Sequence, residues 1–176
     1  MSAQALLEAL WDHGGTVAEL LDDSRVRVDG ESGPPQTAAA GPRTSGRGDE
    51  YELLVEMILE GARLHYGPQR IVRTDDPDLA LLVGDQLYAL GLARLASLGD
   101  LEAVSELADV ISLVAQAQAT DDRELAAAVW EAGAVAVGWG PSDQHTAAKS
   151  LARAGDPRAA EALKSAARAT RVGGPA

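Results

Sequence analysis

A nearly continuous apolar run, from Leu79 to Leu98, is the feature that most constrains how this chain can fold. The run is about long enough to cross a membrane. It contains Asp85, Gln86 and Arg94, however, and polar or charged side chains are costly inside lipid. On a helix its apolar residues point in nearly every direction, which is typical of a helix in the middle of a soluble bundle. We therefore predict a buried helix over residues 77–98 and no membrane span.

Helix start and stop signals recur from residue 49 to residue 171. The candidate caps, whose side-chain oxygens can bond the free amides of a helix start, are Asp49 with Glu52, Asp100, Asp121 with Glu124, and Ser142. Gly67 and Gly99 are candidate stops, because glycine readily adopts the left-handed conformation. The predicted helices cover about 49–66, 77–98, 101–119, 122–137, 142–154 and 157–171. Because no alternating strand pattern is present, residues 49–171 are predicted to form an all-α helical bundle, followed by a disordered tail over residues 172–176.

The first 48 residues have a different composition. Residues 24–48 contain five glycines and three prolines and almost no large apolar side chain. Such a segment buries too little surface to offset its ordering entropy, so it is predicted to be a flexible linker. Residues 1–23 are then tethered amphipathic helices with an apolar stripe that includes Leu6, Leu10 and Trp11. Docking on another chain and folding back onto the bundle are both open for this stripe.

Composition excludes several classes of protein. A chain of 176 residues is enough for one domain with a real core. The absence of cysteine excludes disulfides and thiolate sites. A net charge of −12 disfavours binding to nucleic acid or anionic lipid. Because no signal peptide is visible at the start, a cytoplasmic location is predicted.

Three carboxylates precede the long apolar helix, at Asp75, Asp76 and Asp78. They are weak candidates for a metal site, because carboxylates that share a metal ion on one helix must stand four residues apart, and the residues four positions after Asp75 and Asp76 are apolar. Pro77 also disfavours a helical conformation at Asp76. A helix cap at Asp76 is the favoured interpretation. No catalytic residue, cofactor site or metal site is predicted.

The segment "LALLVGDQLYALGLARLASLGD", residues 79–100, resembles the trans-polyprenyl diphosphate synthases. Gly84 and Asp85 match a Gly-Asp pair of that family, and residues 101–119 resemble the helix that follows. The resemblance covers residues 65–120 and implies an isoprenoid-synthase fold. The family's enzymes bind an allylic diphosphate through magnesium held by two Asp-Asp-x-x-Asp motifs. This chain lacks both motifs and the paired arginines, so the resemblance implies a shortened, non-catalytic relative.

The predicted function is that of a non-catalytic accessory or regulatory subunit of isoprenoid biosynthesis, bound to a catalytic prenyl synthase subunit. Some members of the family are such heteromers. One alternative is a small helical interaction or scaffold protein unrelated to isoprenoids, and another is a divergent, magnesium-dependent prenyltransferase that uses Asp75, Asp76 and Asp85. Self-association is also left open. The predicted interface residues are Leu6, Leu10, Trp11, Leu90, Leu95 and Trp139.

Overall fold

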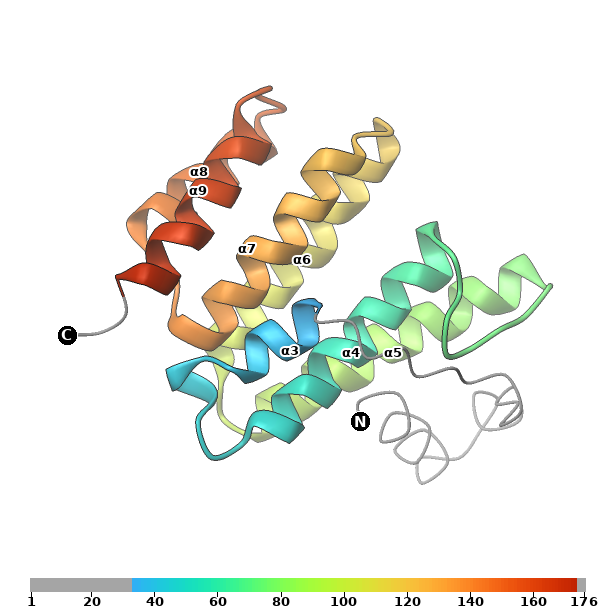
Figure 1. Ribbon diagram of the computed structural model, residues 1–176. Helices are drawn as coiled ribbons and strands as arrows, with labels where there is room; N and C mark the ends of the chain where they lie inside the picture. Colours follow the sequence, from blue (N-terminus) through green and yellow to red (C-terminus); the bar gives the residue numbers. More distant parts are fainter. Residues whose placement is uncertain (1–32, 174–176) are drawn as a thin grey trace.

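The computed structural model describes residues 33–173, and these form an all-α structure without strands (Figure 1). In chain order the elements are α3 (Pro34–Ala39), the 3₁₀ turn η2 (Pro42–Thr44), α4 (Gly48–Tyr66), α5 (Pro77–Ser97), α6 (Leu101–Ala119), α7 (Arg123–Trp139), α8 (Asp143–Arg153) and α9 (Ala159–Val172). The predicted fold class is therefore confirmed. The predicted N-terminal helices and residues 24–32 of the linker lie outside the described residues, as does the tail from residue 174.

The helices pair as three antiparallel hairpins, α4 with α5, α6 with α7, and α8 with α9 (Figure 1). The hairpins lie side by side, and α7 occupies the centre, where it contacts α3, α6 and α9. Most of α7 is buried, and its buried residues are largely alanine, glycine and valine. At Gly133 an added Cβ would lie 2.3 Å from Val110 on α6. Small side chains thus let several neighbours approach α7 at once.

The prediction that the helix over 77–98 lies in the middle of the bundle is wrong. α5 packs mainly against α4 and to a smaller extent against α6, so it stands at the edge. Its glycines lie on the side that meets α4, and much of its other side is exposed. The apolar composition of α5 identified a helix correctly but not its position.

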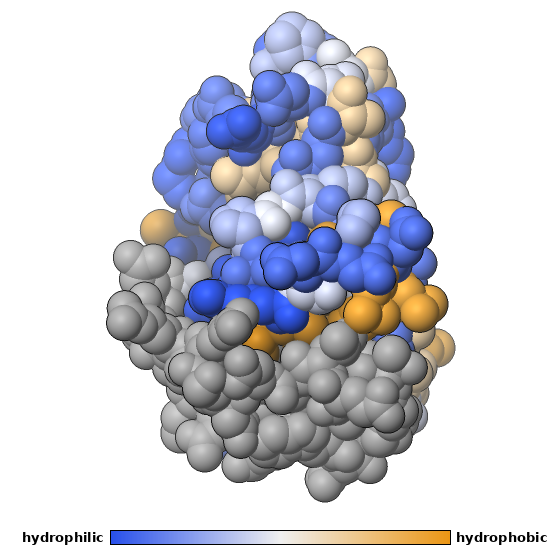
Figure 2. Space-filling view, turned by 90° about the vertical axis from the view of Figure 1, so that its right-hand side faces the viewer, coloured by the Kyte–Doolittle hydropathy of each residue, from blue (hydrophilic) through white to orange (hydrophobic). Residues whose placement is uncertain are grey.

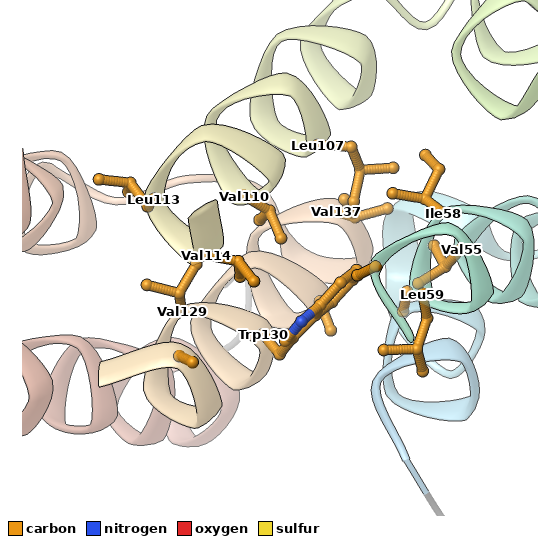
Figure 3. Close-up of a cluster of buried hydrophobic side chains, with 14 of the residues drawn as sticks. Val55, Ile58, Leu59, Leu107, Val110, Leu113, Val114, Val129, Trp130 and Val137 are labelled. Carbon is orange, nitrogen blue, oxygen red and sulfur yellow. The ribbon is translucent and has the colours of Figure 1, made fainter. Parts of the chain in front are cut away.

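One hydrophobic core joins the first two hairpins (Figure 3). Trp130 of α7 extends its ring toward Val55 and Leu59 of α4, while Val110 and Val114 of α6 lie on the other side of α7. Because these side chains come from separate hairpins, the core holds the array together and is not divided among the hairpins.

The prediction of a flexible linker is wrong for residues 33–48. α3 packs against α4 and α7, and Ala38 is fully buried. The buried Thr44 hydroxyl donates to the Ala38 carbonyl at 2.8 Å, and Arg43 donates to the Val137 carbonyl at 2.9 Å. The glycines that suggest flexibility instead permit contact, because a Cβ on Gly41 would lie 2.0 Å from the carbonyl oxygen of Gly138.

The Gly41→Ala substitution should destabilise the fold by about 3 kcal/mol, since the new methyl group meets the backbone of α7, which cannot move aside cheaply. Gly33→Ala is the matched control, because its Cβ would make only ordinary contacts at 3.5 Å or more. Urea unfolding followed by circular dichroism measures both variants. Equal midpoints for the two would show that α3 and η2 are not packed on α7.

Several predicted caps are confirmed and others are displaced. The carboxylates of Asp100 and Asp122 and the Ser142 hydroxyl accept amide hydrogens at the starts of α6, α7 and α8. The prediction for α7 was one residue early, because Asp121 adopts a positive φ of 53° instead. α4 begins at Gly48 without a side-chain cap, so the pairing of Asp49 with Glu52 is wrong.

The predicted helix ends also differ in part from the structure. Gly67 ends α4 in an extended conformation and not in the left-handed one, whereas Gly99 has the expected positive φ of 79°. The last helix begins at Ala159, two residues after its predicted start.

Candidate functional site

The outer face of α5 is an exposed apolar surface. Leu81 and Leu82 have 45% and 59% of their surface exposed, and Ala89, Ala93 and Ala96 continue the exposed face along the helix. These residues share one side because their spacing follows the helical repeat. Figure 2 shows hydrophobic residues gathered on this side of the molecule, next to hydrophilic ones. Large exposed apolar surfaces of this kind mark sites of interaction.

Three glycines fix which side of α5 is buried. A Cβ on Gly84 would lie 2.7 Å from the His65 ring, one on Gly91 would lie 2.8 Å from Ile58, and one on Gly61 would lie 2.9 Å from the Tyr88 ring. Gly84 and Gly91 therefore allow α5 to pack closely on α4. Because the glycine side faces α4, the leucines on the opposite side of α5 face outward.

An aromatic and charged group borders this face where α5 meets the end of α4. The His65 ring stacks on Tyr88 with ring centres 5.3 Å apart. His65 Nε2 lies 3.1 Å from Asp85 Oδ1, but the orientation does not make a hydrogen bond. Burial raises the pKa of Tyr88, and Tyr66 and Asp85 raise it further. Asp85 itself keeps 72% of its side chain exposed, so its carboxylate remains accessible to a partner.

The acidic residues before α5 act at the helix start. Asp76 Oδ1 accepts the amides of Asp78 at 3.0 Å and Leu79 at 3.2 Å, which is the predicted cap. Asp75 and Asp78 are exposed. Within residues 33–173 no three side chains of His, Asp or Glu are grouped so as to hold a metal ion. Asp75 and Asp85, the other candidates of the divergent-enzyme alternative, are not brought into such a group.

Replacing Asp76 with alanine should therefore cost about 1 kcal/mol of stability, the usual value of a lost N-cap. Asp75→Ala is the control, because no helix amide is bonded by that side chain. Thermal unfolding measures both. Calorimetric titration with magnesium tests the alternative role of Asp76. Magnesium binding to wild type that disappears in the Asp76→Ala variant would identify a metal site and contradict the cap.

A polar groove of about 630 Å³ opens beside the loop between α4 and α5. Its lining residues are Gly67, Gln69, Arg73, Thr74 and Asp75. Gln69 accepts the Thr74 amide at 2.8 Å, so part of the lining serves to hold the loop. The groove has no apolar floor and no buried charged side chain, which a specific small-molecule site usually has.

A buried carboxylate holds this same loop on α4. Glu60 is fully buried, and its Oε1 accepts the amides of Arg70 at 3.1 Å, Ile71 at 2.6 Å and Val72 at 3.0 Å. One turn earlier, Glu56 binds the guanidinium groups of Arg63 at 3.1 Å and Arg70 at 2.6 Å. The cluster satisfies the amides of a turn that lacks secondary structure, which is a structural role.

A second buried network joins α6 to α8. Glu106 binds His145 Nε2 at 2.7 Å with one oxygen and Lys149 Nζ at 2.6 Å with the other, and Lys149 also binds Asp109 at 2.7 Å. Burial opposes the charged form of Lys149, but the hydrogen bonds to Asp109 and Glu106 outweigh it and raise the pKa of Lys149. Burial likewise acts to raise the pKa of Asp109, but hydrogen bonds from Arg153 and Lys149 lower it overall.

Histidine beside glutamate is a pairing found in general acid–base sites, but this one has no access for a substrate. The small hollow next to His145 is lined by α7, α8 and α9 and has no room for even a water-sized group. Half of its lining residues are alanine. The network therefore holds the third hairpin on the second, and no cavity beside it could admit a substrate.

The predicted interface residues are distributed unevenly. Leu6, Leu10 and Trp11 lie outside the described residues. Leu95 is completely buried in the core, so its prediction as an interface residue is wrong. Leu90 and Trp139 are partly buried and pack on the core, and Arg171 lies over the Trp139 ring at 5.8 Å. The exposed residues are instead Leu81 and Leu82, whose apolar nature was evident in the sequence but whose outward direction was not.

α5 is also the one helix among residues 33–173 that is long and apolar enough to cross a membrane, and 33% of its most apolar window is buried. This is a weak indication, because a core helix of a soluble protein meets the same criterion. The sequence prediction of no membrane span stays a prediction.

No family model, no curated protein and no solved structure matches this chain.

Proposed function

We propose that this chain is a non-catalytic protein-binding subunit that associates with its partner through the exposed face of α5. The observation that carries the proposal is the position of α5 at the edge of the array, with Leu81 and Leu82 turned to solvent. About half of each leucine is already covered in the free chain, so burying the rest contributes roughly 1 kcal/mol of binding free energy for each side chain.

The proposed partner is a catalytic polyprenyl diphosphate synthase. What supports it is the sequence resemblance over residues 65–120, which falls on α5, the short turn at Gly99 and α6. That succession of helix, turn and helix is the one the resemblance implies. A cytoplasmic location follows from the same proposal. The accessory role is supported further because the carboxylate clusters that such enzymes use are absent from the chain.

The Leu82→Asp variant should lose the partner and keep its fold, because Leu82 is exposed in the free chain. The test is co-expression with the catalytic polyprenyl synthase of the native host, followed by size-exclusion chromatography with light scattering. Val172→Asp is the matched control, since Val172 is 91% exposed and lies on α9, far along the chain from α5. We expect a complex with wild type and with Val172→Asp only. A complex that survives Leu82→Asp would contradict the role of α5.

A scaffold protein unrelated to isoprenoids is the second candidate. The observation that favours it is the side-by-side array of three helical hairpins, an arrangement that repeat proteins use to present extended binding surfaces (Figure 1). Failure of every native polyprenyl synthase to bind, together with a partner that Leu82→Asp loses, would favour this alternative.

A further inference from the structure

We propose that the occupant of the α5 face is an amphipathic helix of another protein that carries arginine or lysine beside its leucines. This inference rests on the proposed function, because it assigns partner chemistry to the same face. It is carried by two properties that coincide on one helix, an exposed apolar surface and unneutralised carboxylates beside it.

The shape of the face suits a helix. Leu81 and Leu82 project near one end of the face. The short side chains of Ala89, Ala93 and Ala96 make the rest of it shallow. Small side chains along one helix let a second helix axis approach to about 8 Å, the lower end of ordinary helix packing. The partner's large apolar side chains would lie over the alanines, and Leu81 and Leu82 would pack between them.

The charge of the face is acidic. Asp78 lies at its leucine end and Asp85 in its middle, whereas Asp75 lies in the preceding loop, where it lines the polar groove together with Arg73. No lysine or arginine within residues 33–173 makes an ion pair with any of these three carboxylates, and only His65 lies beside Asp85. A guanidinium or ammonium group from a partner would place a positive charge beside these carboxylates.

A second copy of this chain does not fit that charge pattern. The exposed positions of α5 hold Asp78 and Asp85 and no lysine or arginine. The whole chain carries a net charge of −12. Pairing two copies through this face would therefore bury apolar surface with carboxylates on both sides, while the one basic residue of α5, Arg94, is half-buried and not among the exposed positions of the face.

The chain's own N-terminal segment fails for the same reason. Residues 1–23 have an apolar stripe of suitable spacing, but their charged side chains are all acidic. They are Glu8, Asp12, Glu19, Asp22 and Asp23, with no lysine or arginine among the first 23 residues. A basic helix from another protein satisfies both the apolar and the electrostatic requirement.

Two synthetic helical peptides test the inference with the full chain. Both carry the same leucine stripe along one face, and the positions beside the stripe are arginine in one peptide and glutamate in the other. Fluorescence anisotropy should show the arginine peptide binding at least about tenfold more tightly, a difference of about 1.4 kcal/mol. Leu82→Asp should lose the arginine peptide, and Val172→Asp should retain it.

A charge reversal separates a local effect from the attraction of an acidic molecule for any basic peptide. The double variant Asp78→Lys with Asp85→Lys should reverse the preference, so that the glutamate peptide binds more tightly. The control reverses the same number of charges elsewhere, at Glu131 and Asp143, which are exposed on α7 and α8. This control should keep the preference for arginine.

Four results would overturn the inference. Two concern the peptides: equal binding of the arginine and glutamate peptides, and the same loss of preference in both double variants. The third is a dimer of this chain that Leu82→Asp dissociates. The fourth is a tenfold gain in peptide affinity on Trp11→Ala, which would assign the face to the N-terminal segment. Failure of the polyprenyl synthase to bind, with the peptides behaving as expected, would remove only that partner. A synthase complex lost in Leu82→Asp but unchanged by charge reversal at Asp78 and Asp85 would remove only the basic-helix inference.

Discussion

Replacing Glu60 with alanine is expected to destabilise the protein by about 3–5 kcal/mol, a large part of the stability of an ordinary domain. The substitution removes the shared acceptor of three backbone amides, two of them buried, and leaves a cavity in α4. Each buried amide without a partner costs about 1–3 kcal/mol. Chemical unfolding followed by circular dichroism and tryptophan fluorescence measures the change.

Two further variants serve as controls for Glu60→Ala. Glu50→Ala makes the same change at an exposed position of the same helix and should stay within about 0.5 kcal/mol of wild type. Glu60→Gln keeps an oxygen for the amides and loses the charge that faces Arg63, so it should cost less than the alanine variant. If Glu60→Ala and Glu50→Ala unfold at the same denaturant concentration, the loop is not held by this carboxylate.

The Lys149→Met substitution is expected to cost about 3–5 kcal/mol, because it leaves the buried carboxylate of Glu106 without its closest positive partner. The double variant Lys149→Met with Glu106→Gln removes both charges and should recover part of that loss. Unfolding free energies of the two single variants and the double variant form a cycle that isolates the pair.

Lys164→Met is the control for this series. Lys164 also pairs with a glutamate of another helix, Glu124, but that pair is accessible to solvent, where ion pairs contribute little. Its unfolding midpoint should stay close to that of wild type. A strictly additive cycle for Lys149 and Glu106 would contradict a direct interaction between α6 and α8.

The sequence was informative where local chemistry decides the structure. The caps at Asp76, Asp100 and Ser142 could be predicted because a side-chain oxygen and the amides it bonds lie within three residues of each other. The helical character of residues 77–98 followed equally from composition. These features depend on few distant contacts.

Features that depend on distant contacts could not be predicted. Gly41 and Gly138 touch although most of the chain separates them, so the glycine and proline content of residues 33–48 suggested flexibility. Glu60 and Glu106 looked like ordinary polar positions of amphipathic helices, because their basic and amide partners come from other segments. One local signal was present in "LLVEMILEGA", where two glutamates interrupt an otherwise apolar stretch.

The same difference explains the error about α5. The apolar composition of a helix indicates how much its burial would stabilise the protein. It does not indicate whether other parts of this chain cover the helix. For α7 the cover comes mainly from α3, α6 and α9, and for α5 it comes mainly from α4. Leu82 and Leu95 are both leucines of one helix, yet one is 59% exposed and the other is completely buried.

The packing of α3 and η2 changes where the folding unit begins. A shortened chain that starts at Asp49, the boundary suggested by composition, would lack the buried residues Ala38 and Thr44. It would leave uncovered the surfaces of α4 and α7 on which α3 packs. It would also lose the Arg43 side chain, which reaches the Val137 carbonyl and the carboxylates of Asp100 and Glu102 and so ties η2 to both helices of the second hairpin. Residues 33–48 are therefore an integral part of the folded domain, and fragments or fusions intended to preserve this architecture must include them.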